Sequence, residues 1–547
     1  MAKKLFAVLF AVVLTLSLAA CSKDAKKTVS VKDETVGAVA SNGGFLVETG
    51  DYVYFLNGVA SAGKYEVGSV TKGALVRVKK TELAAGSANA VDVVVSRLVV
   101  SDDKNSGVYL FDGYFYYAAV STGKNSDGEV KTDKLVFLRT KADGSDTSKS
   151  ICDKDYGSSV EFRFVSAGKN VYLIVKDSSS VYVYDAVARK ELFKYNDSVS
   201  SVQEFMFSSD AGDPTAFFSI KPVNKTTYPV DDDPNRTAEK YHEVYALRFG
   251  ADKAEVKKEL VLNGIGKNTV GNTEEKGVYL TGATFDLVRY VGGELYYSVT
   301  SLDSTGSVTL YNRVAKADLT ESNSLGYNGS AVHETMNYGD KVAASAFSDT
   351  SLIVSAREIL YVNSTQGLMR YDYKEEKTAN VPDGALKILD NEKIKGATLD
   401  FIVNENGTDY LYYHNGNVYY KVNYTAIKDG TNMDEEPLRL NTYDVKTDWY
   451  KPEVVAFEKD GAKHYAFIGV YSDESFMSYV YAIDTTKLKA DYDAFCQGKE
   501  TDEEKAKFYD APTETKKKYE FINSTLLGKM TDANAKTVKD ELAKKKS

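Results

Sequence analysis

Histidine and cysteine, which supply most zinc ligands and many nucleophilic sites, are scarce in this sequence. Its 547 residues include 4 histidines and 3 cysteines. The histidines, at positions 242, 333, 414 and 464, form neither a His-x-x-x-His pair nor a His-Glu-x-x-His motif. The sequence therefore gives little support to a zinc site. A Gly-x-Ser-x-Gly nucleophile elbow and a phosphate-binding glycine-rich loop are also absent.

Tryptophan and proline are rare as well, with 1 and 8 residues, whereas the chain has 40 tyrosines and 24 phenylalanines. Tyrosine suits a half-buried pleated surface, because its ring packs while its hydroxyl stays hydrated. This balance favours a β-rich protein. A chain of 547 residues is too long for one ordinary core, so we expect several domains or one repeat array.

Positive charge is in deficit, and the formal net charge is −10 at pH 7. An acidic protein is repelled by phosphate backbones, so nucleic acid is excluded as an expected partner. The same charge excess keeps an exposed protein soluble. We expect a monomer.

The N-terminus has the form of a secretory signal. The basic segment 1–4 precedes an apolar segment, 5–18, that is too short for an ordinary membrane-spanning helix. Leu18-Ala19-Ala20-Cys21 then resembles a bacterial lipobox. The resemblance implies that residues 1–20 are a lipoprotein signal peptide, that Cys21 carries diacylglycerol, and that its new amine often carries a palmitate-type acyl group.

Lipidation at Cys21 predicts where the protein is located. Two or more acyl chains anchor a protein stably at a membrane, which a single chain does not. Residues 21–40 would then be a lipid-anchored tether, and the chain would face the extracytoplasmic side of the cell membrane. The alternative is an ordinary signal peptide that is cleaved elsewhere, with Cys21 incidental.

The other cysteines, Cys152 and Cys496, lie far apart in the sequence. An exported pair of this kind is able to form a disulfide bond. Each also fits the pattern of a small buried residue, and no cysteine framework is present. Both interpretations stay open.

A short pattern recurs along the chain, in which a turn ending in Gly-Asp is followed by an aromatic strand. Its clearest copy is 50–58, and a second strand, 74–78, follows a loop later. The copy over 161–197 has four strand-length segments separated by Ser, Gly, Asp and Asn turns, as one propeller blade requires. Eight units are predicted, at about 43–83, 91–150, 161–197, 202–262, 283–320, 345–382, 396–428 and 440–487.

Each unit reads as an antiparallel meander that cannot bury both of its faces alone. Radial stacking of neighbouring units solves this problem and leaves few exposed edges. We therefore predict an all-β fold in which residues 41–487 form a β-propeller of seven or eight four-stranded blades. Residues 29–31 or 36–40 would supply a closing strand to the last blade. A pair of stacked sandwiches is the rival fold.

The composition changes near the C-terminus, where aromatic residues thin out and Lys, Glu, Asp and Ala dominate. Residues 488–547 are predicted to form a small α-helical appendage on the rim. Segments 488–495 and 502–509 read as short helices, and segments 513–527 and 532–545 as longer ones.

The pattern Gly-Asp-Tyr-Val-Tyr-Phe at 50–55, with Leu-Val-Arg-Val at 75–78, resembles the repeat region of Gram-positive, clostridial-type surface lipoproteins. That region is similar to YWTD-like propellers described as domains of unknown function. The resemblance covers about residues 40–485. It implies a propeller fold and a cell-surface location, and it implies no particular activity.

Two groups of residues are candidate sites. Asp231, Asp232 and Asp233 are the densest cluster of oxygen ligands and predict a structural calcium ion, with a second cluster at 125–129. A solvated loop is the alternative for both, and no other cofactor is expected. Trp449 and Tyr450, placed in a loop that enters the eighth unit, are candidate anchors for a ligand.

Adjacent tyrosines recur in the predicted strands and point to opposite faces. We expect most of them to pack in blade cores, with exposed members free to bind sugars or proteins. These pairs are 116–117, 296–297, 412–413 and 419–420. The loops 59–73, 118–134 and 221–243 would carry specificity.

Together these features predict a lipid-anchored extracytoplasmic β-propeller that acts as a ligand-binding or protein-interaction scaffold, with a surface protein or glycan as partner. The sequence favours this binding role over an enzyme. The alternative is a hydrolase or lyase that acts on polysaccharide or cell-wall material through an axial pocket lined by carboxylates. A third possibility is an envelope-assembly factor.

Overall fold

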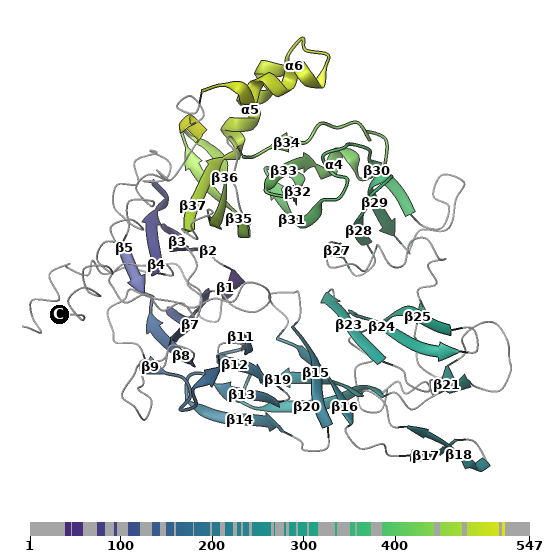
Figure 1. Ribbon diagram of the computed structural model, residues 1–547. Helices are drawn as coiled ribbons and strands as arrows, with labels where there is room; N and C mark the ends of the chain where they lie inside the picture. The colour runs from purple at the N-terminus through teal and green to yellow at the C-terminus, as the bar shows by residue number, and fades with distance from the viewer. Residues whose placement is uncertain are drawn as a thin grey trace, which may run out of the picture.

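The protein is largely β-sheet in the computed structural model (Figure 1). The structure describes residues 39–44, 46–57, 74–81, 92–95, 108–120, 134–142, 149–157, 160–178, 180–196, 200–207, 214–222, 227–230, 233–239, 243–263, 267–268, 278–279, 284–291, 294–303, 306–315, 334–335, 351–355, 358–372, 385–441, 449–472, 478–512 and 517–519.

Consecutive strands pair antiparallel and form successive meanders, which we number as sheets 1 to 8. Sheet 1 contains β2 (Leu46–Glu48), β3 (Tyr52–Asn57), β4 (Ala74–Lys79) and β5 (Asp92–Val95). Sheet 2 contains β1 (Val39–Gly44), β6 (Val108–Phe111), β7 (Tyr114–Val120) and β8 (Lys134–Lys141), with β9 (Lys149–Ser150) and β10 (Tyr156–Gly157) both paired to β8. Sheet 3 contains β11 (Glu161–Ala167), β12 (Asn170–Asp177), β13 (Ser180–Asp185) and β14 (Lys190–Tyr195).

The next two sheets carry additional short strands. Sheet 4 contains β15 (Ser200–Phe207), β16 (Ala216–Pro222), β19 (Glu243–Phe249) and β20 (Val256–Asn263). A separate hairpin of β17 (Thr227–Val230) and β18 (Asp233–Glu239) lies between β16 and β19 in the chain. The pair β21 (Lys267–Asn268) and β22 (Val278–Tyr279) precedes sheet 5, which contains β23 (Thr284–Val291), β24 (Glu294–Asp303), β25 (Gly306–Ala315) and β26 (Glu334–Thr335).

The last three sheets continue the same order. Sheet 6 contains β27 (Leu352–Ser355), β28 (Glu358–Asn363), β29 (Gly367–Asp372) and β30 (Ala385–Leu389). Sheet 7 contains β31 (Thr398–Glu405), β32 (Thr408–Asn415), β33 (Val418–Asn423) and β34 (Leu438–Arg439), with α4 (Tyr424–Ile427) after β33. Sheet 8 contains β35 (Trp449–Lys459), β36 (Ala462–Ser472) and β37 (Ser478–Asp484).

The sheets follow one another around a ring, as Figure 1 shows from β2–β5 through β31–β34 to β35–β37. The ring closes where β3 of sheet 1 contacts β37 of sheet 8. Successive four-stranded meanders in a ring form a propeller-like arrangement, and the predicted β-rich repeat is confirmed to this extent.

Tight hairpins at the start of several sheets follow directly from the sequence. Asp112 and Gly113 join β6 to β7, Asn406 and Gly407 join β31 to β32, and Asp460 and Gly461 join β35 to β36. All six residues have positive φ. Two-residue hairpin loops that match the strand twist need positive φ at both positions, and Asp-Gly and Asn-Gly adopt it readily.

Hydrophobic clusters hold neighbouring sheets together. Tyr116 packs between sheets 2 and 3, whereas its neighbour Tyr117 packs between sheets 1 and 2. In the same way Tyr412 faces sheet 8 and Tyr413 faces sheet 6. All four side chains are buried. The prediction that adjacent tyrosines pack mainly in the cores is confirmed at these positions, because the strand alternation sends each ring to a different interface.

Hydrogen bonds across the interfaces supplement this packing. The hydroxyl of Tyr172 in sheet 3 donates to the carbonyl of Gly250, which follows β19 of sheet 4, at 2.6 Å. The backbone N–H of Leu287 in sheet 5 donates to a carboxylate oxygen of Glu204 in sheet 4 at 2.5 Å. Tyr465 of sheet 8 accepts at 2.9 Å from the backbone N–H of Asn406 in the first hairpin of sheet 7.

Two predicted strand assignments are wrong. Residues 39 and 40, expected to close the last blade, belong to β1, which pairs with β6 in sheet 2. There β1 covers an edge of the short strand β6 that would otherwise present unpaired backbone groups. Residues 92–95, expected to open the second unit, pair instead with β4 in sheet 1. Segment 29–31 lies outside the described residues, and within those residues sheet 8 has three strands.

Helices follow sheet 8, as Figure 1 shows at the outer side of the ring. The elements are α5 (Thr485–Cys496), α6 (Asp502–Ala506), η4 (Lys507–Asp510) and η5 (Lys517–Tyr519). The predicted helices at 488–495 and 502–509 correspond to α5 and to α6 with η4. The longer predicted helices at 513–527 and 532–545 lie outside the described residues, apart from η5. Within the described part of the chain, no helix combines the length and apolarity needed to cross a membrane.

The adjacent residues Tyr412 and Tyr413 provide a matched test of this packing. The hydroxyl of Tyr413 is buried and has no hydrogen-bond partner among the described residues, whereas that of Tyr412 donates to the Glu405 carboxylate. Tyr413→Phe should leave the free energy of unfolding unchanged or raise it by up to about 1 kcal/mol, because a buried unpaired group is removed. Tyr412→Phe should lower it by about 1.5–3 kcal/mol, the usual worth of a hydrogen bond to a charged group. Urea unfolding followed by circular dichroism measures both, and equal losses for the two variants would contradict the assignment.

Candidate functional site: a cavity beside helix α5

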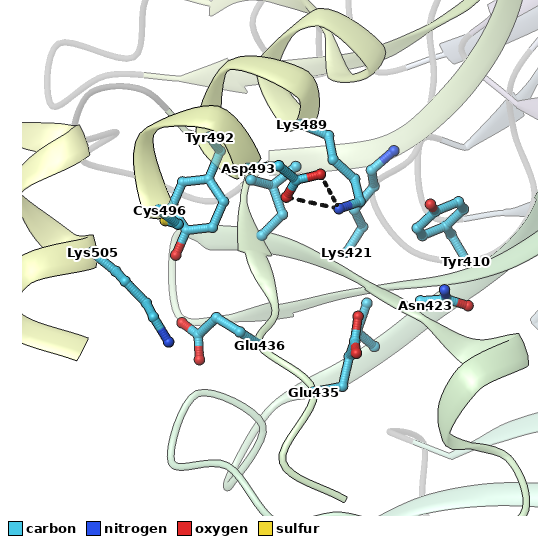
Figure 2. Close-up of a pocket in the computed structure, with 12 residues that line it drawn as sticks. Tyr410, Lys421, Asn423, Glu435, Glu436, Lys489, Tyr492, Asp493, Cys496 and Lys505 are labelled. Atoms are coloured by element: carbon cyan, nitrogen blue, oxygen red, sulfur yellow. Dashed lines mark hydrogen bonds and ion pairs between the residues drawn. The ribbon is translucent and has the colours of Figure 1, made fainter. Parts of the chain in front are cut away.

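A cavity of about 210 Å³ lies between sheet 7 and the helices α5 and α6. Its floor comes from sheet 7 and the segment before β34, with Tyr410, Lys421, Asn423, Glu435, Glu436 and Leu438 among the lining residues. The helices supply Lys489, Tyr492, Asp493, Cys496 and Lys505. Figure 2 shows these side chains converging from the two sides. We call this space the α5 cavity.

The strand register of sheet 7 places the floor residues on one face. Tyr410 pairs with Asn423 and Tyr412 pairs with Lys421 across β32 and β33. Since alternate residues of a strand share a face, all four side chains project toward sheet 8 and α5. Asn423 also ends β33, because its side chain accepts a hydrogen bond from the backbone N–H of Ala426 at 3.1 Å and so begins α4.

The wall formed by α5 follows from its capping and periodicity. Asp484 ends β37 and caps the helix, accepting from the backbone N–H of Lys487 at 2.9 Å. Leu488 and Tyr492, four residues apart, are buried in the cluster shared with sheets 7 and 8. Helical spacing then brings Lys489, Asp493 and Cys496 onto the side that lines the cavity.

A buried ion pair fixes the helix to the sheet. The ammonium of Lys421 lies 2.8 Å from a carboxylate oxygen of Glu405, and the two side chains are only 2% and 6% exposed. The same ammonium donates to the hydroxyl of Thr485, the first residue of α5, at 3.3 Å, and lies 4.4 Å from the ring centroid of Tyr410. The hydroxyl of Tyr412 donates to the other oxygen of Glu405.

This network satisfies the charges at the base of the cavity. Burial lowers the pKa of Lys421, and the negative charge of Glu405 opposes that effect by favouring the ammonium. Burial and the Glu405 carboxylate both raise the pKa of Tyr412, which keeps its hydroxyl protonated as a donor. The result is a rigid floor, because every member of the network holds a partner on another element.

Other charged groups of the lining are paired near the rim. Lys489 and Asp493, four residues apart on α5, form an ion pair at 2.8 Å that appears as dashed lines in Figure 2. Glu436 accepts from Lys393 and, at 3.3 Å, from the side-chain amide of Asn391. These contacts connect the α5 cavity to the segment between β30 and β31.

Cys152 and Cys496 are both free thiols, so the disulfide alternative is not realised. Cys152 is buried between sheets 2 and 3, and burial raises the pKa of its thiol to about 11. Cys496 is half-buried and lines the α5 cavity. The two thiols therefore differ sharply in environment.

Each of the two described histidines has its Nδ1 atom within hydrogen-bond distance of an aspartate carboxylate. His414 Nδ1 lies 2.9 Å from Asp400, and the ring packs against Tyr419 immediately before the hairpin at residues 415–418. His464 Nδ1 lies 3.0 Å from Asp484, the residue that caps α5. His414 therefore flanks a turn. Histidines 242 and 333 lie outside the described residues.

The predicted anchor residues Trp449 and Tyr450 lie in a strand, whereas the sequence predicted a loop. They begin β35 and pair with Tyr471 and Val470 of β36, so they belong to a strand and not to a loop. A register shift follows between Tyr450 and Glu453. Pro452 lies inside that shift and has no N–H to donate to the strand ladder. The strand therefore forms a bulge at this point and continues beyond it. Their role in ligand binding stays a prediction.

The predicted calcium site stays untested. Asp231 and Asp232 lie outside the described residues, while Asp233 is the first residue of β18. Within the described residues no three His, Cys, Asp or Glu side chains gather as a metal site. The cluster at 125–129, the loop 59–73 and Cys21 also lie outside the described residues.

Of the buried network, only Tyr412 was named from the sequence, as one of the adjacent tyrosines expected in a blade core. One signal was available, because Lys421 stands at an inward position of the aromatic strand 418–423. A lysine at such a position is rarely buried without a partner. The partner, Glu405, ends β31, which β32 separates from the strand of Lys421, and only the β31–β32–β33 meander brings the two side chains together.

The buried ion pair gives a second testable expectation. Lys421→Met should lower the free energy of unfolding by about 3–5 kcal/mol, because it leaves the Glu405 carboxylate buried without its cation. Adding Glu405→Gln should recover much of that loss, since the amide still accepts from Tyr412 but carries no charge. Lys489→Met, at the exposed pair with Asp493, serves as the control and should cost at most about 0.5 kcal/mol. Thermal and urea unfolding measure the cycle, and additive losses would show that the pair is not coupled.

No family model matches the sequence, and the comparison with curated proteins gives no match. Among solved structures, a post-proline cleaving enzyme from Rickettsia typhi is 11% identical with a TM-score of 0.37, over 82% of this chain and 58% of that one. The Dos1 propeller is 10% identical with a TM-score of 0.34, over 81% and 92%. The β-propeller domain of the Trilobed protease from Pyrococcus furiosus is 8% identical with a TM-score of 0.29, over 82% and 94%.

The chain spans about half the length of the peptidases it matches, with 49% of a prolyl endopeptidase covered. No activity is carried over from these likenesses.

Proposed function

We propose that the chain is a lipid-anchored extracytoplasmic β-propeller that binds a small ligand in the α5 cavity and serves as a scaffold at the cell surface. Sheets 1 to 8 would be its eight blades, and α5 with α6 its helical appendage. The α5 cavity is the observation that carries the proposal. It is a recess lined by polar groups from two strands, a connecting segment and two helices, on a floor fixed by the Lys421–Glu405 pair.

The geometry of the cavity favours binding as its role. Ligand sites are preformed concave spaces in which a few polar groups fix the orientation of the ligand among apolar and aromatic walls. Here Tyr492 and Leu438 supply buried apolar surface, while Asn423, Glu435 and Lys505 supply polar groups. Lys421 and Glu436 at the floor are committed to structural partners, so they would orient a ligand without reacting with it.

The lipid anchor is supported by the sequence Leu18-Ala19-Ala20-Cys21 after a basic and an apolar segment. Growth of a Gram-positive host with labelled palmitate should label the wild-type protein and place it in the membrane fraction. Cys21→Ser should abolish the label and release the protein, because no thiol is left to accept the lipid. Cys496→Ser is the control and should keep both label and location. A soluble wild-type protein, or a label that survives Cys21→Ser, would refute the anchor.

Cys496 offers a direct way to test the binding role. In a Cys21→Ser background, a bulky maleimide at pH 7.5 should modify the half-buried Cys496 and spare Cys152, whose raised pKa of about 11 leaves very little thiolate. Modified and unmodified protein are then incubated with a small-molecule extract of the cell envelope, and retained compounds are identified by native mass spectrometry. We expect a compound that is retained only when the cavity is open. If modified and unmodified protein retain the same compounds, the proposed site is wrong. It is also wrong if maleimide-treated Cys496→Ser protein, which has no thiol in the cavity, retains the same compounds as the modified protein.

A further inference from the structure

We propose that the α5 cavity takes a small zwitterion, such as a free amino acid or a dipeptide, which carries one ammonium and one carboxylate. This inference rests on the proposed binding function and names the ligand class. It follows from which charges of the lining already hold a partner and which do not.

Most charged side chains of the lining are compensated by a protein partner. Lys421 is paired with Glu405, Lys489 with Asp493, and Glu436 with Lys393. Each pair sums to zero charge. These groups therefore form a polar wall and leave no net charge for a ligand to neutralise.

Two opposite charges remain. The ammonium of Lys505 on α6 has no hydrogen bond or ion pair within the described part of the chain. The carboxylate of Glu435 accepts from the side-chain amide of Asn432 at 2.8 Å through one oxygen only, and no cation lies within ion-pair distance of it among those residues. Figure 2 shows Lys505 reaching in from the helices and Glu435 from the segment before β34, on different sides of the space.

Both groups are half-buried, so their charges are partly removed from water. A ligand that is only anionic or only cationic would satisfy one of them and bury the other without a partner, which costs free energy. An uncharged polyol would hydrogen-bond to both groups but would neutralise neither. A ligand with separated opposite charges and no net charge compensates both at once.

The size of the α5 cavity and its uncharged lining residues suit the uncharged part of such a ligand. The volume of about 210 Å³ is below the roughly 300–1,000 Å³ of pockets for drug-sized ligands, so the occupant is small. The hydroxyl of Tyr410 and the side-chain amide of Asn423 line the same space and supply hydrogen bonds near Glu435. Leu438 and the ring of Tyr492 give the apolar contact that an aliphatic side chain requires.

The test uses the purified chain with each of the twenty L-amino acids and with glycylglycine, screened by thermal shift and quantified by calorimetry. The best ligand is compared with its N-acetyl, amide and N-acetyl-amide derivatives, which lack the ammonium, the carboxylate or both. We expect binding of the zwitterion and at least a tenfold loss for each charge removed, with glucose and N-acetylglucosamine not binding.

Charge-specific variants assign each end of the ligand. In Lys505→Gln the free acid and its amide should bind equally, because the partner of the carboxylate is gone. In Glu435→Gln the free amine and its N-acetyl derivative should bind equally, because the partner of the ammonium is gone. Lys507→Gln, two residues along and outside the lining, is the control and should bind as the unchanged protein does.

The outcomes separate the ligand class from the binding function itself. If no amino acid or dipeptide binds, or if the uncharged derivatives bind as tightly as the zwitterion, the proposed class is wrong. If a sugar binds instead and maleimide at Cys496 blocks it, the class fails while the binding function stands. If maleimide at Cys496 changes the binding of no compound, the proposed function fails as well.

Discussion

The structure depends on one constraint, that a meander of aromatic strands has two apolar faces and must cover both. Adjacent tyrosines meet this constraint directly, because successive residues of a strand point in opposite directions. Tyr412 packs toward sheet 8 and Tyr413 toward sheet 6, and Tyr116 and Tyr117 divide in the same way between sheets 3 and 1. Each sheet is therefore completed only by its neighbours, and the ring follows from local alternation.

The constraint also explains where polar chemistry is found. Interfaces between two sheets are filled with aromatic and aliphatic side chains, whereas part of the face of sheet 7 is covered by α5. A helix with a narrow buried stripe covers less area than a sheet, so Leu488 and Tyr492 complete the core and leave the α5 cavity beside them. The ion pair of Lys421 with Glu405 lies at this boundary, where its partners come from both the sheet and the helix.

Local features of the fold were accessible from the sequence. Aromatic alternation predicted the central strands of the sheets but not outer strands such as β20, β30 and β34. The sequences Asp112-Gly113 and Asn406-Gly407 specify hairpins through their positive φ angles. Long-range pairings were not accessible. Strand β1 pairs with β6 across many intervening residues, and the sequence contains no local sign of that choice. Trp449 was predicted to lie in a loop that enters the eighth unit, yet it pairs with Tyr471 because the long partner strand β36 continues the ladder past the bulge.

The candidate site was hidden from the sequence for a related reason. Tyr410, Asn423, Glu435, Asp493 and Lys505 come from two strands, a connecting segment and two helices, and no spacing rule joins them. Sequence motifs report chemistry that one local segment performs, such as a metal-binding turn or a phosphate-binding loop. A cavity between a sheet and a helix is created by tertiary packing, so its residues look like ordinary surface charges until the fold brings them together.

The topology adds a relation between the start of the described chain and this cavity. Val39, the first residue of β1, pairs with Phe111 beside the first hairpin of sheet 2, at residues 112 and 113. Tyr410 and Asn423 lie beside the corresponding hairpin of sheet 7, at residues 406 and 407. In a ring whose sheets repeat one strand order, the first hairpins all lie on the same face. The strand that follows the proposed tether and the α5 cavity are therefore on one face, while the β17–β18 hairpin, which connects the second and third main strands of sheet 4, leaves from the opposite face. If the chain is anchored as proposed, the α5 cavity and the start of the described chain would both lie on the membrane side of the ring, and the β17–β18 hairpin would lie on the other side.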